Sequence, residues 1–420
     1  MNYSLYVHIP FCTRRCAYCD FNTYAGQEDS IAAYVEALCR EIEIVGMSAP
    51  EKIAAHTVFF GGGTPSLLSP SQFKSILDSI RGYFELTEGA EITMEANPGT
   101  VSADELTELR RLGINRISLG AQSANGEELR MLERTHSFLD VIEAVSSARR
   151  AGFGNLNLDL IYGLPEQSLV TWRTTIARIL DLHPEHISAY ALTLEHGTAF
   201  GNWSARGLLS PPDPDAGAAM YEWASEALKR AGYIQYEISN WAKTEGQEPR
   251  NRREGNLPEA EFSPLPDFAC RHNLQYWRCL PYLGLGAGAH GYAHGMRYSN
   301  VLRIKTYIER LRGRSERGTG LKFPLSPATV NQHRQTSQDD MSEFMIMGLR
   351  LTNEGIAPST FQARFGLQLA EVYGGETNEL AGLDLLEWVN KDGSGADAPE
   401  ALRLTSRGRL LGNQVFVRFV

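Results

Sequence analysis

The chain has 420 residues, which is too long for one ordinary hydrophobic core and predicts two or three structural units. Its composition, 43% hydrophobic and 21% charged, is that of a globular protein, and its net charge of −10 argues against nucleic acid as the main partner. The first residues, MNYSLYVHIP, lack the basic and apolar regions of a secretory signal, and no window reaches the ~18 consecutive apolar residues of a membrane span. We therefore expect a cytoplasmic, reducing environment.

The first 240 residues alternate strand-like and helix-like segments with short connections. The strand-like segments cover residues 4–9, 57–65, 91–98, 115–123, 155–165, 186–194 and 233–239. The helix-like segments cover residues 32–45, 69–80, 102–113, 168–180 and 218–232. The second of these starts with a serine cap and a proline in its first turn. Repeated βα units predict an α/β fold with a parallel sheet that is closed or partly closed into a (β/α) barrel.

Polar and glycine clusters follow the predicted strands. These clusters are Cys12–Cys19, Gly61–Pro65, Glu95–Pro98, Gln122, Asp159 and Thr193. In folds of this kind the chemistry gathers at the carboxyl ends of the strands. One shared pocket is therefore a better explanation than six unrelated polar sites.

The rest of the chain divides into two further parts. Residues 241–335 are predicted to form an extension and linker, with an inserted polar loop at 243–267 that is rich in proline and glycine. Residues 336–420 combine helical pieces with two strands around a turn, which predicts a small α+β domain of the winged-helix type. Its hairpin tip is acidic (Asp392, Asp397 and Glu400), which favours a structural or docking role over DNA binding.

Three cysteines, Cys12, Cys16 and Cys19, stand within eight residues after the first predicted strand. A reducing compartment argues against disulfides. Zinc would normally require four ligands, and a second pair exists only as Cys270 and Cys279, far along the chain. Three closely spaced thiolates suit a [4Fe–4S] cluster and would leave its fourth iron open to another ligand. The polar residues between the cysteines argue against a loop of buried structural thiols.

The segment CTRRCAYC, with Tyr18 before the last cysteine, resembles the signature of radical S-adenosylmethionine (SAM) proteins. The resemblance implies that Cys12, Cys16 and Cys19 hold a [4Fe–4S] cluster whose open iron chelates the methionine part of SAM. Further matches point to the oxygen-independent coproporphyrinogen III oxidase group and imply a radical SAM partial barrel over residues 1–240. The SAM contacts that the resemblance implies are Tyr6, Tyr18, Gly61, Gly62, Gly63, Thr64, Glu95, Gln122, Arg134 and Asp159. Individually, each glycine could serve a tight turn and each polar residue could be an ordinary strand end.

Two kinds of protein in this group compete: the decarboxylating oxidase and the HemW-type haem chaperone. Three departures from the oxidase pattern favour the chaperone. Phe21 stands where the oxidase has a fourth cysteine, and the few residues before the first strand lead us to expect no N-terminal extension. The segment HNLQYW matches the HNxxYW motif associated with the chaperone, through His272, Asn273, Tyr276 and Trp277.

A haem site at this motif has physical sense, because histidine is the commonest axial ligand and aromatic side chains supply flat apolar walls. The alternative is that His272 and Asn273 cap a turn while Tyr276 and Trp277 belong to the core. The arginine-rich segment 303–317 could meet haem propionates or anionic lipid head groups, but such a stretch is more often a solvated helix face.

The favoured function is therefore a haem chaperone that binds haem, a [4Fe–4S] cluster and SAM, and delivers haem to acceptor haemoproteins. The alternative is coproporphyrinogen III decarboxylation in porphyrin metabolism, and no catalytic residue is assigned. A radical enzyme that modifies tRNA would need a basic RNA-binding module, which this acidic chain lacks. A position at the membrane periphery, membrane-associated acceptors and a homodimer stay open.

Overall fold

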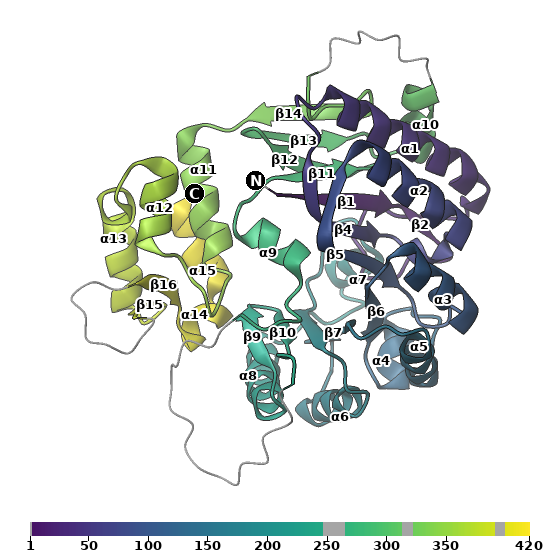
Figure 1. Cartoon of the computed structure of the whole chain (residues 1–420). Helices are drawn as coiled ribbons and strands as arrows, with labels where there is room; N and C mark the ends of the chain where they lie inside the picture. Colours follow the sequence, from purple (N-terminus) through teal and green to yellow (C-terminus); the bar gives the residue numbers. More distant parts are fainter. Residues whose placement is uncertain (1, 247–264, 313–321, 391–399) are drawn as a thin grey trace. The chain divides into compact units, whose positions relative to one another are not determined.

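The computed structural model of the chain describes residues 2–246, 265–312, 322–390 and 400–420. The chain forms two compact units (Figure 1). The first contains Met1–Glu185, Ala189–Met220 and Pro281–Arg334, and the second contains His186–Ser188, Tyr221–Leu280 and Gln335–Val420.

The first unit begins with the βα series that the sequence predicts. Its long strands are β1 (Tyr3–Ile9), β4 (Ala54–Gly62), β5 (Glu85–Ala96), β6 (Arg116–Gln122) and β7 (Leu156–Tyr162), and β8 (His186–Ala191) ends in it. Its helices are α1 (Ile31–Ser48), α2 (Pro70–Tyr83), α3 (Ala103–Leu112), α4 (Gly126–Met131), α5 (Phe138–Arg150), α6 (Leu169–Leu180), α7 (Ala199–Ala205) and α10 (Ile304–Arg312). The short elements are β2 (Phe11–Cys12), β3 (Tyr24–Ala25), η1 (Glu28–Ser30) and η2 (Pro65–Leu67).

The strands from β1 to β7 pair in parallel, in the order β1-β4-β5-β6-β7. On one face of these strands the side chains are apolar and buried, and Val58 pairs with Ile92 in the register. Helices α1, α2, α3 and α5 lie side by side along the sheet (Figure 1). Ser69 caps α2 in a capping box with Gln72, so the predicted helix start is confirmed. The predicted α/β fold with a parallel sheet is confirmed.

Residues after Pro281 extend the same sheet. Strand β11 (Tyr282–Leu285) pairs in parallel with β1, and β12 (His290–Ala293), β13 (Met296–Asn300) and β14 (Thr329–Arg334) follow it in antiparallel pairs. The first unit therefore has the strand order β14-β13-β12-β11-β1-β4-β5-β6-β7. Chain segments far apart in sequence thus flank β1, the strand that leads into the cysteine loop.

A buried carboxylate fixes α1 to this extension. Glu41 accepts hydrogen bonds from the Gly286 N–H, the Asn300 amide, the Tyr307 hydroxyl and the Ser326 hydroxyl, each at 2.7 Å. Burial raises the pKa of Glu41, and these four donors oppose the rise. All four donors share Glu41 as their acceptor, so moving α1 away would break the four hydrogen bonds together. The cluster therefore holds α1, β13 and α10 in one arrangement.

The second unit is helical around two small groups of strands. Its strands are the start of β8, β9 (Ile234–Glu237), β10 (Asn240–Ala242), β15 (Leu386–Val389) and β16 (Ala401–Leu404). Its helices are the later part of α8 (Pro214–Arg230), α9 (Arg271–Trp277), α11 (Ser337–Gly348), α12 (Pro358–Phe365), α13 (Leu369–Gly382), α14 (Ser406–Leu410), α15 (Gly412–Phe416) and η3 (Val417–Phe419). Strands β8, β10 and β9 are neighbours, and both pairs are antiparallel.

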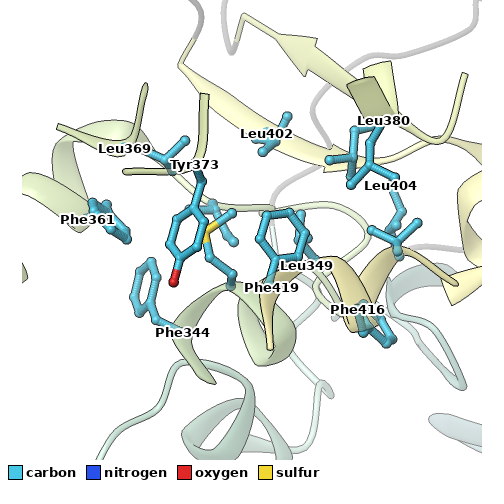
Figure 2. Close-up of a cluster of buried hydrophobic side chains, with 14 of the residues drawn as sticks. Phe344, Leu349, Phe361, Leu369, Tyr373, Leu380, Leu402, Leu404, Phe416 and Phe419 are labelled. Carbon is cyan, nitrogen blue, oxygen red and sulfur yellow. The ribbon is translucent and has the colours of Figure 1, made fainter. Parts of the chain in front are cut away.

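The C-terminal part of this unit has its own apolar core, and Figure 2 shows the side chains that meet there. Phe361 of α12 and Tyr373 of α13 face Phe344 of α11 and Leu402 of β16 in this cluster (Figure 2). Strands β15 and β16 form an antiparallel hairpin in which Leu386 pairs with Leu404. Three helices packed on a hairpin confirm the predicted winged-helix-like α+β domain.

Some predictions fall outside the described residues. These are most of the polar loop 243–267, the end of the arginine-rich segment 303–317, and Asp392 and Asp397 at the hairpin tip. Across the described ranges, no helix is both long and apolar enough to cross a membrane.

Candidate functional site

A cavity of about 430 Å³ lies at the carboxyl ends of the strands in the first unit. Its volume falls in the range of small-molecule sites. The lining comes from every polar cluster that follows a predicted strand, including Cys12, Gly62, Asn97, Gln122, Asp159 and Thr193. The prediction of one shared pocket is therefore confirmed.

The cysteine loop is closed by backbone hydrogen bonds. Strands β2 and β3 pair in parallel, with Cys12 opposite Ala25, so both ends of the loop are fixed. Inside it, the Cys19 N–H donates to the Cys16 carbonyl at 3.2 Å, which forms a tight turn. All three cysteine side chains line the cavity and are partly buried.

The glycine loop after β4 lies directly against the cysteine loop. The Gly63 N–H donates to the Ile9 carbonyl at 2.8 Å, and the Thr64 N–H donates to the Phe11 carbonyl at 2.7 Å. A side chain at Gly63 would bring Cβ to 2.5 Å from the Phe11 carbonyl oxygen. Gly62 has φ 111, and a Cβ there would meet the His8 ring. Only glycine permits this close approach.

Burial and hydrogen bonds set the state of the thiols. Burial raises the pKa of Cys12, and the Thr64 hydroxyl, 3.5 Å from the Cys12 sulfur, opposes the rise. Burial likewise raises the pKa of Cys19, while Thr23 opposes it. Burial therefore disfavours the thiolate forms of Cys12 and Cys19, and a bound metal centre would favour them.

Two carboxyl groups face the same cavity. Glu95, at the end of β5, accepts the Gly62 N–H at 3.0 Å. Burial, together with neighbouring Asp159, raises the pKa of Glu95 to about 7, although Gly62 and Arg116 oppose the rise. Asp159, on β7, is oriented by the Ser118 hydroxyl at 2.8 Å. The cavity floor thus carries negative charge that grows as Glu95 ionises.

Arg134 crosses the cavity from the turn after α4. Its guanidinium donates to the Cys16 sulfur at 3.6 Å, to the Gly120 carbonyl at 2.9 Å and to the Asn97 side chain at 2.6 Å. Gln122, which ends β6, has φ 64, a left-handed conformation that is unusual for a residue with a side chain. Strained residues of this kind often mark functional sites.

Eight of the ten residues that the resemblance implied for SAM line the cavity: Tyr18, Gly62, Gly63, Thr64, Glu95, Gln122, Arg134 and Asp159. Gly61 and Tyr6 do not line it. Burial and the nearby Glu95 raise the pKa of Tyr6, and its hydroxyl lies 3.0 Å from His8 Nδ1. His8 Nε2 donates to the Asn22 carbonyl, so Nδ1 is the acceptor for Tyr6.

The sequence interpretation missed several lining residues. Asn97 lies in the flagged cluster Glu95–Pro98 but was not assigned a role, and Thr23 carries no sequence signal at all. Phe21 and Tyr190 also line the cavity, and these two residues are 63% and 42% exposed. Two aromatic faces therefore meet solvent in the cavity lining.

The HNxxYW residues lie in the second unit, on helix α9. His272 is only 1% exposed, and its Nε2 lies 2.9 Å from the Tyr276 hydroxyl. Trp277 is half-buried, and the Arg350 guanidinium stacks 4.5 Å from the centre of its ring. Asn273 is half-buried on the same helix. The arrangement brings the His272 and Tyr276 rings together, whereas Trp277 packs against a separate apolar cluster that includes Leu274 and Leu351.

Comparisons with known proteins place the chain. The family model for the radical SAM superfamily matches residues 6–179, and the model for the HemN C-terminal domain matches residues 335–411. Heme chaperone HemW of Bacillus subtilis strain 168 is 35% identical over 99% of this chain and 99% of its own length. Heme chaperone HemW of Lactococcus lactis strain IL1403 is 33% identical over 99% of this chain and 97% of its own length.

The chain belongs to the HemW family of radical SAM proteins.

A solved structure shows the same fold along the whole chain. Coproporphyrinogen III oxidase (HemN) from Escherichia coli, described as a radical SAM enzyme, superposes with a TM-score of 0.77 at 23% identity. The match covers 100% of this chain and 90% of that one. The predicted radical SAM type of the fold is thereby confirmed.

The radical SAM fold implies a [4Fe–4S] cluster and SAM, and the residues present fit both groups. Three thiols line one cavity of a size that suits a small molecule. Within the described ranges, no group of three or more histidine, cysteine, aspartate or glutamate side chains could hold a single metal ion. The ligands of a single metal ion must converge on one point. A [4Fe–4S] cubane does not require this, because each thiolate binds a separate iron and the sulfurs can stand apart.

Proposed function

We propose that this protein is a haem chaperone that binds haem, a [4Fe–4S] cluster and SAM, and passes haem to acceptor haemoproteins. The observation that carries the proposal is the similarity to proteins named heme chaperone HemW over 99% of this chain. The HNxxYW residues on α9 and the thiol-lined cavity support it. Acceptors at the membrane periphery and a homodimer belong to the same proposal.

The cavity residues divide into two roles. Cys12, Cys16 and Cys19 would hold the cluster, which supplies an iron that can chelate the methionine part of SAM. The eight lining residues named above would surround SAM. Tyr6 and Gly61 would not touch SAM directly: Tyr6 contacts His8, and Gly61 lies beside Glu95. The carboxyls of Glu95 and Asp159 suit a ligand with a sulfonium charge, because opposite charges attract strongly where water is excluded.

SAM binding is expected to depend on pH through Glu95. Its pKa of about 7 means that it is half neutral at neutral pH. If the cationic ligand lowers this pKa by about one unit, affinity rises about fivefold from pH 6 to pH 8. Equilibrium binding of SAM to the cluster-loaded protein at pH 6, 7 and 8 would measure this change in affinity.

Glu95→Gln supplies the control for this dependence. Because the amino group of SAM also titrates near this range, the diagnostic quantity is the difference between the pH profiles of the two proteins. If SAM affinity changed with pH in the same way in the wild-type protein and in Glu95→Gln, Glu95 would not interact with the positive charge of SAM.

Haem binding is expected to require His272. Loss of an axial ligand should weaken haem binding at least tenfold, about 1.4 kcal/mol, in His272→Ala. Because the Tyr276 hydroxyl lies against Nε2, Tyr276→Phe should remove that contact and preserve or strengthen haem binding. An anaerobic haem titration followed by absorbance compares the three proteins.

His290→Ala is a matched control, because His290 is an exposed histidine on β12 of the first unit. It should titrate like the wild-type protein. If the wild-type protein and His272→Ala bound haem with equal affinity, His272 would not be a haem ligand. If none of the proteins bound haem, the chaperone proposal would be wrong.

The oxidase alternative has less support. The likeness to HemN is 23% identical and concerns the fold. At the position of the fourth oxidase cysteine stands Phe21, whose ring lines the cavity and offers no thiol. Coproporphyrinogen decarboxylation by the cluster-loaded protein is the assay that would revive it.

A further inference from the structure

Each clustered cysteine has a separate hydrogen-bond donor beside its sulfur. The pairs are Thr64 Oγ1 with Cys12 at 3.5 Å, Arg134 Nη1 with Cys16 at 3.6 Å, and Thr23 Oγ1 with Cys19 at 4.0 Å. A thiolate can only accept, so each pair runs toward sulfur once the thiols are deprotonated. The three donors come from different parts of the chain, which is unexpected for incidental contacts.

Asn97 joins two of these donors. Its side-chain oxygen accepts from Arg134 Nη2 at 2.6 Å, and its side-chain nitrogen donates to Thr64 Oγ1 at 3.0 Å. A guanidinium can only donate, so the amide oxygen must face Arg134 and the amide nitrogen must face Thr64. The Thr64 oxygen is thereby used as an acceptor, and its own proton is directed toward Cys12.

The hydrogen bonds from Arg134 to Asn97 and from Asn97 to Thr64 form a relay, which is anchored at Arg134 and at Asn97. Arg134 also donates to the Gly120 carbonyl at 2.9 Å, which fixes the plane of its guanidinium. Asn97 starts a turn in which the Thr100 N–H and hydroxyl both donate to its carbonyl, at 3.1 and 2.7 Å. Asn97 therefore stands on rigid backbone directly after β5, between two donors that reach toward sulfur.

We propose that Asn97 is a positioning residue whose relay through Arg134 and Thr64 holds hydrogen-bond donors on the Cys16 and Cys12 thiolates and raises the reduction potential of the cluster. The inference rests on the proposed cluster site and goes beyond it, because it assigns a tuning role to residues that do not bind iron.

The direction of the effect follows from charge. Reduction adds one negative charge to the cluster and its thiolates, so donors at sulfur stabilise the reduced form more than the oxidised form. Removing a donor lowers the potential. The Arg134 donor is charged, so its bond is stronger than that of a hydroxyl.

The test is a reductive titration of the anaerobically reconstituted protein, with iron content measured on each sample. Thr64→Val removes the last bond of the relay with little change of shape, and Thr64→Ser keeps the hydroxyl. We expect iron to be retained in both, a lower potential in Thr64→Val, and a potential close to wild type in Thr64→Ser.

Asn97→Leu tests the relay itself. It should lower the potential in the wild-type background, and less in the Thr64→Val background, since the Thr64 bond to Cys12 is already lost there and only the Arg134 bond to Cys16 is left to disturb. In a Thr23→Val background the effect of Asn97→Leu should be unchanged, because the Cys19 donor lies outside the relay. A purely structural Asn97 would change thermal stability and leave the potential alone.

Two results overturn the inference. If Thr64→Val and Asn97→Leu keep their iron and have the wild-type potential, the relay does not act on the cluster. If the wild-type protein itself retains no cluster iron, the proposed cluster site fails and the inference falls with it. Iron content separates these two cases. If Asn97→Leu does not fold, the comparison of Thr64→Val with Thr64→Ser decides alone.

Discussion

Replacing any one of Cys12, Cys16 or Cys19 with serine is expected to reduce the iron content of the reconstituted protein from about four atoms per chain to near zero. A hydroxyl is a poor ligand for iron in this setting, and two remaining thiolates cannot hold a cubane against exchange with solvent. All three sulfurs line one cavity, so no other cysteine stands ready to replace a lost ligand there. Iron analysis and the loss of the broad absorbance near 400 nm measure the result.

Cys39→Ser provides the matched control. Cys39 is a half-buried cysteine on α1 and does not line the cavity. It should therefore leave the iron content unchanged. Full iron in the Cys12, Cys16 and Cys19 variants alike, or equal loss in Cys39→Ser, would contradict the assignment of the cluster to the N-terminal loop.

The location of this site could be predicted from the sequence because it depends on chain direction. Parallel strands bring their carboxyl ends to one edge, so polar residues that follow successive strands must converge. Gly62 ends β4, Glu95 is the second-last residue of β5 and Asp159 lies within β7, and all three line the same cavity. No knowledge of side-chain contacts was needed for that step.

The hydrogen-bond partners within the site could not be predicted in this way. Whether Asn97 contacts Arg134 depends on rotamers and on the turn after α4, and neither leaves a periodic pattern in the sequence. Thr23 owes its place to the two-residue pairing of β2 with β3. Such short pairings are set by tertiary packing rather than by local propensity.

Strands β11 to β14 were also not foreseen. The sequence analysis assigned these residues only to an extension and linker, because the segment 284–295 is rich in glycine. At Gly284 a Cβ would stand 1.9 Å from the His290 carbonyl oxygen, so glycine is required where the hairpin closes. Glycine in a strand weakens the very pattern by which strands are recognised.

The HNxxYW motif contains a contact that its spacing allows one to foresee. His272 and Tyr276 are four residues apart on a helix, which places their side chains on the same face. Their rings meet edge to face at 5.0 Å, and Tyr276 engages the imidazole nitrogen that haem would need. Ligation of haem through Nε2 would require that this contact open, which is why Tyr276→Phe is an informative variant.

Glu237 is expected to make the second unit less stable as the pH rises from 5 to 8. This carboxyl ends β9 and is fully buried, and burial raises its pKa to about 7 even though Arg350, Asn240 and the Ser239 N–H oppose the rise. Its Oε1 accepts from Ser239 and Asn240, whereas Oε2 has no hydrogen-bond partner among the described residues. In the unfolded chain the same group titrates near 4.5.

The sign follows from proton uptake. Below pH 4.5 both states hold the proton and Glu237 costs nothing, whereas between 4.5 and 7 only the folded state holds it, so raising the pH favours unfolding. The integrated loss from pH 5 to pH 8 is about 2 to 3 kcal/mol. Other groups also titrate, because burial lowers the pKa of His136 to about 4, which makes stability rise with pH over part of the same range.

Glu237→Gln isolates the contribution, because glutamine keeps an acceptor for Ser239 and Asn240 and cannot ionise. Urea unfolding of the metal-free protein, followed by tryptophan fluorescence, gives the free energy of unfolding of both proteins at each pH. The variant should gain about 2 to 3 kcal/mol over the wild-type protein between pH 5 and pH 8. A constant difference across that range would mean that Glu237 is ionised throughout, and that Arg350 outweighs the cost of burying the charge.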